Sequence, residues 1–238
     1  MIDKLDLKDK KLLYELDLNS RQSFNKLAKK LKLSKTSVIY RINNLQKSGI
    51  IKQFHTVVDI GKLGYISFRL YLKLQNTTLK KEQEIIDFLE KKEIVTWLVS
   101  IEGGYNIGAL ILTKSIKEIN NLWKELSGKY VNCLDKKLLT IMTKVSYFSR
   151  AYLLDLKHNN YEIIFITEPE EVKLDKIDIE ILKLLAPNAR ISIIELAKRL
   201  NITQKTIISK IRTLEKKEII IGYKTVFDLE KLGYHYFK

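Results

Sequence analysis

The 238-residue sequence predicts an α+β fold, and three observations carry that prediction. A segment with three helical patterns followed by β-branched residues occurs twice, 169 positions apart. Between the copies, strand and helix patterns alternate in the order strand, helix, strand, strand, helix, strand. The last of these strands is predicted over residues 136–148, "KKLLTIMTKVSYF". Hydrophobic residues make up 45% of the chain, which is enough to form folded cores.

The repeat becomes visible when residues 5–68 are aligned without a gap on residues 174–237. Twenty-six of the 64 positions are identical, and most of the others keep their polarity. "LAKKLKLS" in the first copy matches "LAKRLNIT" in the second, and "TVVDIGKLGY" matches "TVFDLEKLGY". A match of this length indicates that one type of domain has been duplicated within the chain.

The residue pattern of each copy predicts three helices and a β-hairpin. The short turns "KLS" and "NIT" end on Ser34 and Thr203, which are residues that cap the following third helix. A short helix, a tight turn and a longer helix is the spacing of a helix-turn-helix. The segments "GIIKQFHTVVD" and "EIIIGYKTVFD" then predict strands of a wing. The predicted architecture is therefore two winged helix-turn-helix domains flanking one ferredoxin-like βαββαβ domain.

The solvent-facing side of each third helix is polar. In the first copy it carries Lys35, Thr36, Ser37, Tyr40, Arg41 and Asn44, and in the second Gln204, Lys205, Thr206, Ser209, Lys210 and Thr213. Such side chains can reach base edges and phosphates, and they lie on the turns that enter a major groove in helix-turn-helix proteins. We predict that these residues bind double-stranded DNA.

The charge distribution supports the same partner. Residues 1–64 hold 14 Lys and Arg against 6 Asp and Glu, and residues 173–238 hold 14 against 8, so the copies carry +8 and +6. Residues 65–172 hold 15 against 14 and carry only +1 of the total of +15. Lysines that only increase solubility would be spread evenly, whereas a polyanionic partner for the repeats explains this concentration.

Several other classes of function have no support in the sequence. It contains no nucleotide-binding loop and no nucleophile elbow, and its three histidines and single Cys133 are too scattered for a closed zinc site. We therefore expect no catalytic residue, no metal and no cofactor. One cysteine cannot build a disulfide framework, which predicts the reducing cytoplasm. The apolar runs are about half of what a bilayer crossing needs, so no membrane partner is expected.

The repeat resembles a known family. The patterns "LDxxDxxLLxxL", "NSRxSxxxLAKxLxLSxxxVxxRIxxLxxxGII" and "VVDxxKLG" are similar to those of the leucine-responsive regulator (Lrp/AsnC) family of transcription factors. The second copy resembles it too, except that Glu218 stands where the first copy has Gly49. The resemblance implies a sequence-specific DNA-binding transcriptional regulator whose ferredoxin-like domain senses a ligand and dimerises.

The same resemblance marks a candidate effector site in the middle domain. "EGGYNIG" is similar to the family's glycine loop, which implies that Gly103, Gly104, Tyr105 and Asn106 bind a small-molecule effector such as an amino acid. The family pattern has an aspartate at the position of Asn106. The two glycines fit an ordinary hairpin turn equally well, so both interpretations remain open.

The predicted domain boundaries follow from these patterns. They are residues 1–64 for the first winged helix-turn-helix domain, 65–149 for the ferredoxin-like domain, 150–172 for a connector, and 173–238 for the second winged domain. "KLGYHYFK" aligns with "KLGYISFR", so we expect the chain to stop in the first strand of a second, missing ferredoxin-like domain. The single middle domain would then pair between chains, which predicts a homo-oligomer.

Two alternative functions remain on the same fold. Sirohaem decarboxylases resemble this combination of helix-turn-helix and ferredoxin-like domains and act on a polyanionic tetrapyrrole. A sequence-neutral chromatin protein would bind all DNA duplexes alike. The concentration of charge on the repeats and the polar third helices favour the regulator.

Overall fold

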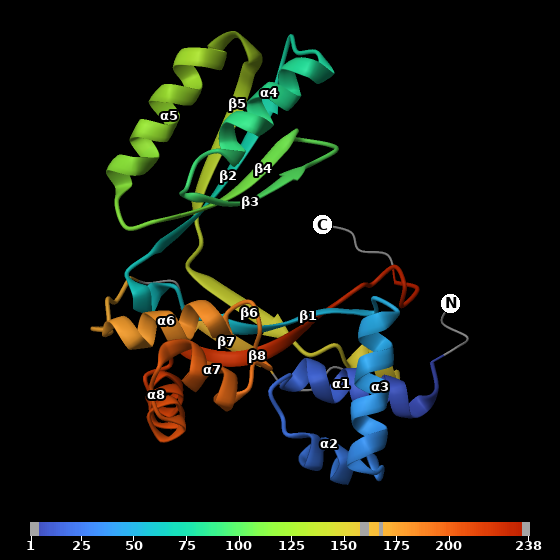
Figure 1. Cartoon of the computed structure of the whole chain (residues 1–238). Coiled ribbons are helices and arrows are strands. Elements are labelled where there is room, and N and C mark those ends of the chain that lie inside the picture. The colour runs from blue at the N-terminus through green and yellow to red at the C-terminus, as the bar shows by residue number, and fades with distance from the viewer. Residues whose placement is uncertain (1–4, 158–161, 167–168, 235–238) are drawn as a thin grey trace. The chain divides into compact units, whose positions relative to one another are not determined.

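The computed structural model describes residues 5–157, 162–166 and 169–234. The chain divides into two compact units. The paired-repeat unit holds residues 1–59, 146–164 and 173–238, and the sheet unit holds residues 60–145 and 165–172. Both copies of the repeat therefore belong to one unit (Figure 1).

Each copy forms the three helices expected of it. In the first copy they are α1 (Leu7–Leu18), α2 (Phe24–Leu31) and α3 (Lys35–Lys47). In the second copy they are α6 (Lys176–Leu185), α7 (Ile193–Leu200) and α8 (Gln204–Lys216). Both third helices bury apolar side chains at i, i+4 and i+7, and these are Val38, Ile42 and Leu45 in α3 and Ile207, Ile211 and Leu214 in α8.

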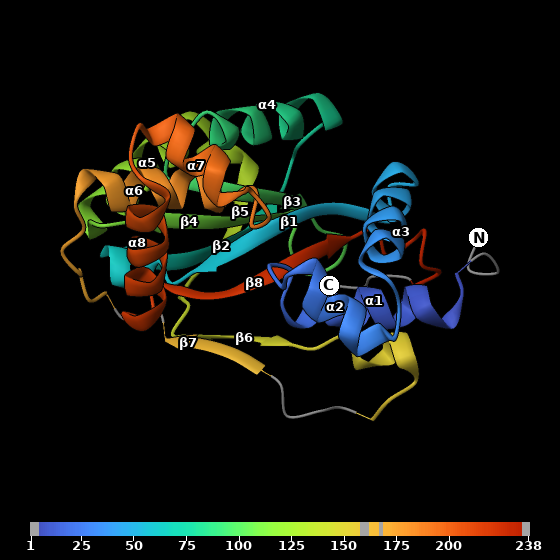
Figure 2. The same ribbon diagram turned by 60° about the horizontal axis from the view of Figure 1, so that its bottom comes forward.

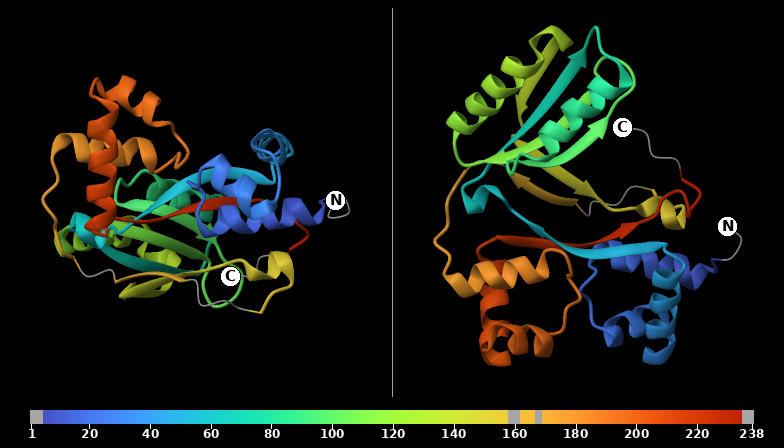
Figure 3. Two further views of the ribbon diagram at one scale, coloured as in Figure 1. Left: turned by 90° about the horizontal axis from the view of Figure 1, so that it is seen from below. Right: turned by 45° about the horizontal axis from the view of Figure 1, so that its top comes forward.

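The predicted hairpin within each copy is wrong. Each copy contributes a single strand, β1 (Ile51–Val58) or β8 (Ile220–Phe227), and these two strands pair antiparallel with each other. After β1 the chain makes a 3-10 turn at Gly61–Leu63 and continues into the sheet unit, so the described part of the first copy holds no second wing strand. The backbone groups of β1 are satisfied by the other copy instead. Figure 3 shows the two strands side by side, with the helices of the two copies at either end of this ribbon.

The register of the ribbon makes the two copies pseudo-symmetric. His55 lies directly opposite Lys224, and these residues are equivalent positions of the repeat. A strand that pairs with its own equivalent at the centre is what a two-fold axis through that pair produces. The pKa of His55 is lowered, mainly because the side chain is buried and secondly because Arg150 and Lys224 carry positive charges nearby.

Hydrogen bonds on the two sides of this pseudo-axis match each other. The hydroxyl of Thr56 on β1 donates to the carbonyl oxygen of Leu185 on α6 at 2.8 Å. The equivalent hydroxyl of Thr225 on β8 donates to the carbonyl oxygen of Leu16 on α1, also at 2.8 Å. Each first helix is therefore bonded to the strand of the other copy, which ties the two copies together.

Two equivalent arginines also cross between the copies. Arg21 donates to the carbonyl oxygens of Ala189 and Ile191, and Arg190 donates to those of Ser20 and Gln22. The pKa of Arg190 is lowered to about 10, mainly because burial disfavours its charged form and secondly because Arg21 carries a positive charge nearby. These half-buried guanidinium groups, by donating to backbone carbonyls of the other copy, help to fix the relative positions of the copies.

The connector breaks this symmetry. Its 3-10 turn at Ala151–Leu154 packs against α1, and the strands β6 (Lys144–Phe148) and β7 (Glu162–Ile166) form a two-stranded sheet. Arg150 bonds the carboxylate of Asp17, which is fully buried, through both its side chain and its backbone nitrogen. The second copy has Ala186 at the position of Asp17, so this ion pair has no counterpart there.

The sheet unit has the expected order of strands and helices. Its strands are β2 (Ile66–Leu74), β3 (Val95–Ser100), β4 (Ile107–Thr113) and β5 (Leu134–Ile141), and its helices are α4 (Leu79–Glu90) and α5 (Ile116–Tyr130). The sheet order β3-β4-β2-β5 is that of a ferredoxin-like fold. Alternate residues of β2 pack with apolar residues of both helices in one core, so α4 and α5 cover the same face.

One strand prediction is wrong in this region. Residues 136–148 were expected to form a single strand, but they divide into β5 and β6 at residues 142–143. β5 pairs with β2 up to the Ile141–Phe68 pair, and β2 itself begins at Ile66. In this antiparallel register Met142 and Thr143 lie opposite the last β2 residues, and the nitrogen of Met142 still donates to the carbonyl oxygen of Ser67 at 2.9 Å. From Lys144 onward no β2 residue lies opposite the chain, and β6 pairs with β7 instead. The strand expected at the end of the chain falls on residues 235–238, outside the described residues.

Candidate nucleic-acid interface

The two helix-turn-helix segments are built in the same way. Ser23 caps α2 by accepting a hydrogen bond from the nitrogen of Lys26 at 3.2 Å, and Ser34 caps α3 by accepting from that of Ser37 at 3.0 Å. Between them Lys32 takes a left-handed conformation with φ 53°. The second copy repeats the pattern, with Asn201 also at φ 53°. These caps and turns fix where each third helix begins.

Most of the DNA-binding residues predicted from the sequence lie in solvent. On α3 Lys35, Thr36, Tyr40 and Asn44 are exposed, and on α8 Gln204, Lys205, Ser209 and Thr213 are exposed. Ser37 and Thr206 are half-buried one turn into their helices. Tyr40 has 66% of its surface exposed. The two faces can therefore contact a large ligand without rearrangement.

Arg41 and Lys210 are held differently from the others. Arg41 forms ion pairs with Asp6 at 2.8 Å and Asp9 at 2.7 Å, and the hydrogen bond to Asp9 raises the pKa of Arg41. Lys210 forms the equivalent pairs with Asp175 and Asp178. Each cation thus joins the third helix to the capping box that begins the first helix of the same copy. This engagement gives both side chains a structural role.

Sequence reasoning missed Arg212 on α8 and its equivalent Asn43 on α3. Both are exposed, and Arg212 lines a shallow open groove together with Lys205, Ile208, Ser209, Thr213 and Lys216. Lys205, Ser209, Arg212 and Lys216 follow one another at i, i+4, i+7 and i+11, so they form a single stripe along the helix. That spacing is the signal that could have identified Arg212 from the sequence.

A second open groove lies between the two copies. Arg21, Arg190 and Lys35 line it, together with Gln22, Ser23, Phe24, Asn25, Ile191, Ser192 and Ile193. Lys35 is also the first residue of α3, so this groove adjoins the exposed face of that helix. The three cations of this groove add positive charge between α3 and α8 to the positive charge that these helices carry themselves. Figure 2 shows α3 and α8 at opposite ends of the β1–β8 ribbon.

The candidate effector residues lie between β3 and β4. The side-chain oxygen of Asn106 accepts from the nitrogen of Leu74 at 2.9 Å, and its backbone nitrogen donates to the carbonyl oxygen of Leu72 at 2.8 Å. Asn106 therefore fastens the turn to β2. Gly103 has φ 128°, a conformation that side chains other than glycine rarely adopt. This geometry is that of a hairpin connection, and effector binding there stays a prediction.

Metal and membrane sites have no candidates in the part of the chain that the structure describes. Within that part, histidine, cysteine, aspartate and glutamate side chains form no group that could hold a metal ion. None of the described helices combines the length and apolar character needed to cross a membrane.

Known proteins resemble the chain at the level of its domains. A family model described as winged helix-turn-helix DNA-binding matches residues 5–52 and 174–221, which are the two copies of the repeat. An uncharacterized HTH-type transcriptional regulator of Pyrococcus horikoshii is 32% identical over 139 residues, covering 58% of this chain and 93% of that regulator. The HTH-type transcriptional regulator Ptr1 of Methanocaldococcus jannaschii is 26% identical over 145 residues, covering 60% of this chain and 93% of Ptr1.

Solved structures give the same picture of the fold. The AsnC family transcriptional regulator of Agrobacterium tumefaciens is 17% identical with a TM-score of 0.50, covering 58% of this chain and 89% of that chain. The siroheme decarboxylase NirDL is 16% identical with a TM-score of 0.65, covering 92% of this chain and 65% of that chain. This chain thus spans about two thirds of the decarboxylase, and at such identities both likenesses concern the fold alone.

Proposed function

Because the chain belongs to a family of HTH-type transcriptional regulators with winged helix-turn-helix DNA-binding domains, we propose that it binds specific DNA sequences with two third helices of the same chain. α3 and α8 each enter a major groove, and each contacts its own half of the operator. The remaining cations contact phosphates and set the position of the chain on the duplex.

One observation carries this proposal. Two third helices with exposed polar faces belong to a single compact unit, joined by the β1–β8 ribbon. Helix-turn-helix proteins commonly obtain such a pair by dimerisation of two chains. Here the inter-copy hydrogen bonds of Thr56, Thr225, Arg21 and Arg190 support the pair within one chain.

The proposed base contacts come from the residues that are exposed and free of ion pairs in the structure. On α3 these are Lys35, Thr36, Tyr40, Asn43 and Asn44, and on α8 they are Gln204, Lys205, Ser209, Arg212 and Thr213. Asparagine and glutamine suit adenine, and arginine suits guanine, because each can form two hydrogen bonds to those base edges. Arg41 and Lys210 support the helices from behind through their carboxylate partners.

Selection of bound sequences from a random duplex pool at a stated salt concentration tests the proposal. We expect enrichment of a defined sequence with two unlike halves. Affinity for that sequence should fall roughly 10³–10⁵-fold between 50 and 200 mM salt if six to ten phosphates are contacted. A pool without enrichment would instead favour the sequence-neutral chromatin protein, and an affinity that ignores salt would contradict the electrostatic argument.

The siroheme decarboxylase alternative rests on a likeness of fold that extends over both copies and the sheet unit. The pure protein can be titrated with an iron porphyrin and followed by visible absorbance. Tight saturable binding together with failure of the DNA selection would support the enzyme. Specific DNA binding without a porphyrin complex supports the regulator.

The sheet unit supports a further proposal, that two chains associate through it. β5 is an edge strand of the sheet, and Leu138 and Ile141 on it are 40% and 59% exposed. An apolar edge strand with unpaired backbone groups favours pairing with a second copy. Light scattering at micromolar concentration should give the mass of a dimer or larger assembly, and a monomer mass would contradict the association.

A further inference from the structure

The open groove between the two copies has walls of equivalent residues. Residues 21–25 of the first copy and residues 190–193 of the second copy line it. These segments include the first residues of α2 and α7, and Figures 1 and 2 both show α7 and α2 between α8 and α3. Because equivalent segments form both walls, the pseudo-two-fold axis of the paired-repeat unit passes through the groove. The groove therefore lies between the two helices that are proposed to read the operator.

The two arginines of this groove carry positive charge that no acidic side chain balances there. Neither aspartate nor glutamate is among the described residues that line the groove. Glu215, which accepts a hydrogen bond from the hydroxyl of Tyr223, lies in the vicinity of Arg21. Arg190 lies beside the like charge of Arg21, and Lys35 adds a third cation to the lining. Like charges held this close favour an anionic ligand, because an anion offsets their mutual repulsion.

Each guanidinium group also keeps hydrogen-bond donors for a ligand. An arginine has five N–H donors, and the bonds of Arg21 and Arg190 to the other copy all use the two donors on Nη1. The Nη2 and Nε atoms of both side chains form no hydrogen bond with the described residues and are not among the buried atoms that lack a partner, so solvent reaches them. The ring of Phe24, centred 4.4 Å from the guanidinium carbon of Arg190, restricts that group further. Two fixed forks of this kind match the oxygen atoms of phosphate groups.

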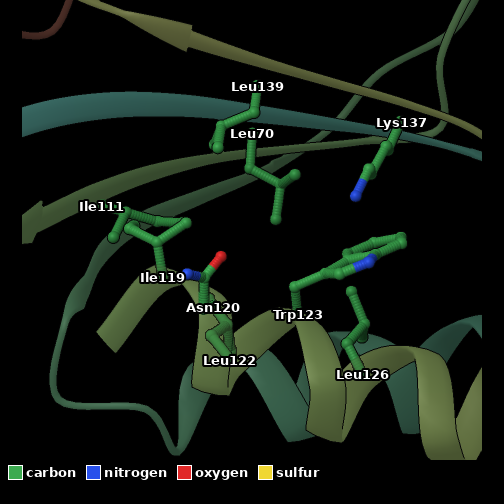
Figure 4. A pocket seen from close by; sticks show the side chains of 9 residues that line it. All are labelled: Leu70, Ile111, Ile119, Asn120, Leu122, Trp123, Leu126, Lys137 and Leu139. Atoms are coloured by element: carbon green, nitrogen blue, oxygen red, sulfur yellow. The ribbon is translucent and has the colours of Figure 1, made fainter. Parts of the chain in front are cut away.

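A cavity in the sheet unit offers no comparable set of donors. Figure 4 shows Lys137 beside the ring of Trp123, and the ammonium group lies 3.4 Å from the centre of that ring. Lys137 is exposed on the edge strand β5 and is the single cation among the described residues that line this cavity. The cavity volume, about 80 Å³, is about half that of a cavity that holds benzene in another protein. Paired cations beside an open space therefore favour the groove between the copies.

The proposed function identifies which phosphates could reach this groove. The third helices of paired helix-turn-helix units enter major grooves one helical turn apart on the same side of a duplex. A minor groove lies between two such major grooves, and backbone phosphates form both of its edges. We propose that Arg21 and Arg190 bind two backbone phosphates, one at each edge of the minor groove at the centre of the operator. This inference rests on the proposed function, and it adds a contact that fixes the position of the chain without reading a base.

Duplexes with single neutral linkages test the contact without changing the protein. In the selected sequence, a methylphosphonate replaces one phosphate at a time, either at the edges of the central minor groove or outside both half-sites. Fluorescence anisotropy should show about tenfold or more weaker binding for the central changes, because a charge-assisted hydrogen bond is lost, and a much smaller change for the outer ones. Equal effects of central and outer changes would overturn the proposal.

Two variants connect the central phosphates to the arginine pair. Arg190→Gln should bind more weakly and should no longer distinguish one of the central methylphosphonate duplexes from the unmodified duplex. Arg199→Gln is the matched control, because Arg199 is an exposed arginine outside the groove, and it should keep the full sensitivity of the unmodified chain. A merely structural role of Arg190 would lower affinity for all duplexes alike and would contradict the proposal. If Arg190→Gln does not fold, the comparison of duplexes with the unmodified chain still decides.

The outcomes separate this inference from the proposed function. Sequence-specific binding that ignores the central methylphosphonates would overturn the inference and leave the proposed function in place. Failure of the sequence selection would remove both. Calorimetric titration with pyrophosphate in the absence of DNA distinguishes a free phosphate compound from the duplex. Tight saturable pyrophosphate binding, combined with no effect of the central methylphosphonates, would overturn the assignment of the groove to DNA.

Discussion

Helices α3 and α8 occupy equivalent places in the two copies, yet only their buried faces are alike. Val38, Ile42 and Leu45 on α3 correspond to Ile207, Ile211 and Leu214 on α8. On the exposed face, Thr36, Tyr40 and Asn43 of α3 stand where α8 has Lys205, Ser209 and Arg212. One face thus presents an aromatic ring and amides, while the other presents a stripe of cations.

The difference shows which constraints act on each face. A buried side chain must fill a fixed volume, so both copies keep β-branched or leucine residues there. The exposed side chains do not have to fill a fixed volume. Their divergence is what we expect if α3 and α8 bind different DNA sequences. Position 41 and its equivalent 210 follow the buried pattern, because in both copies a cation there is bound to two carboxylates.

The largest effect, a loss of stability, is expected at Asp17, because the first copy buries a charge there and the second copy does not. Asp17 is fully buried beside Arg150 and 3.8 Å from Lys224, whereas the second copy has Ala186. Asp17→Ala should lower the free energy of unfolding by about 3–5 kcal/mol, because it leaves buried cations without their partner. Urea denaturation of the full chain measures this. Ala186→Ser is the matched control in the second copy, and an equal loss for both changes would mean that the ion pair contributes nothing.

The next largest effect is expected on DNA affinity, from a change in the cationic stripe of α8. Arg212→Ala should weaken binding to the selected sequence by about 1–3 kcal/mol, since arginine forms two hydrogen bonds with guanine. Asn43→Ala changes the equivalent position of α3 and should relax specificity in the other half of the operator. Fluorescence anisotropy on sequences altered in one half at a time distinguishes the two. If both variants lost discrimination in the same half, α3 and α8 would not read separate halves.

Arg41→Ala tests whether the retained ion pair is structural. Loss of its bonds to Asp6 and Asp9 should lower the free energy of unfolding by about 1 kcal/mol, which is the upper range for partly exposed pairs. DNA affinity should change less than it does in Arg212→Ala. A folded Arg41→Ala protein with unchanged stability and a tenfold loss of affinity would instead place Arg41 on a base.

The smallest effect concerns the residue after each third helix. Gly49 has φ 72°, and Glu218 at the equivalent position has φ 56°, so the second copy keeps the left-handed turn without a glycine. That conformation disfavours a residue with a Cβ atom, so Glu218→Gly should raise the free energy of unfolding by about 0.5–1 kcal/mol. Thermal denaturation of the Glu218→Gly and Gly49→Ala variants measures the effect of a change at each of these two equivalent positions. A loss of stability in Glu218→Gly would show that the glutamate side chain contributes more than the strain removes.

Local patterns allowed the helices, their caps and the order of the sheet unit to be predicted. Apolar spacing identified α3 and α8, and the duplicated turns "KLS" and "NIT" located their starts. The pairing of β1 with β8 could not be predicted, because a strand's sequence does not specify its partner when the two lie far apart in the chain. The ion pairs of Arg41 were hidden for a similar reason, since they depend on how α3 packs against the start of α1.

The central claim is that one chain reads two unlike half-sites, and grafting one face onto the other tests it most directly. The changes Lys35→Gln, Thr36→Lys, Tyr40→Ser, Asn43→Arg and Asn44→Thr give α3 the exposed residues of α8. Sequence selection should yield two unlike halves with the unmodified chain and a two-fold symmetric sequence with the grafted chain. A symmetric sequence from the unmodified chain, or the same sequence from both proteins, would contradict the account.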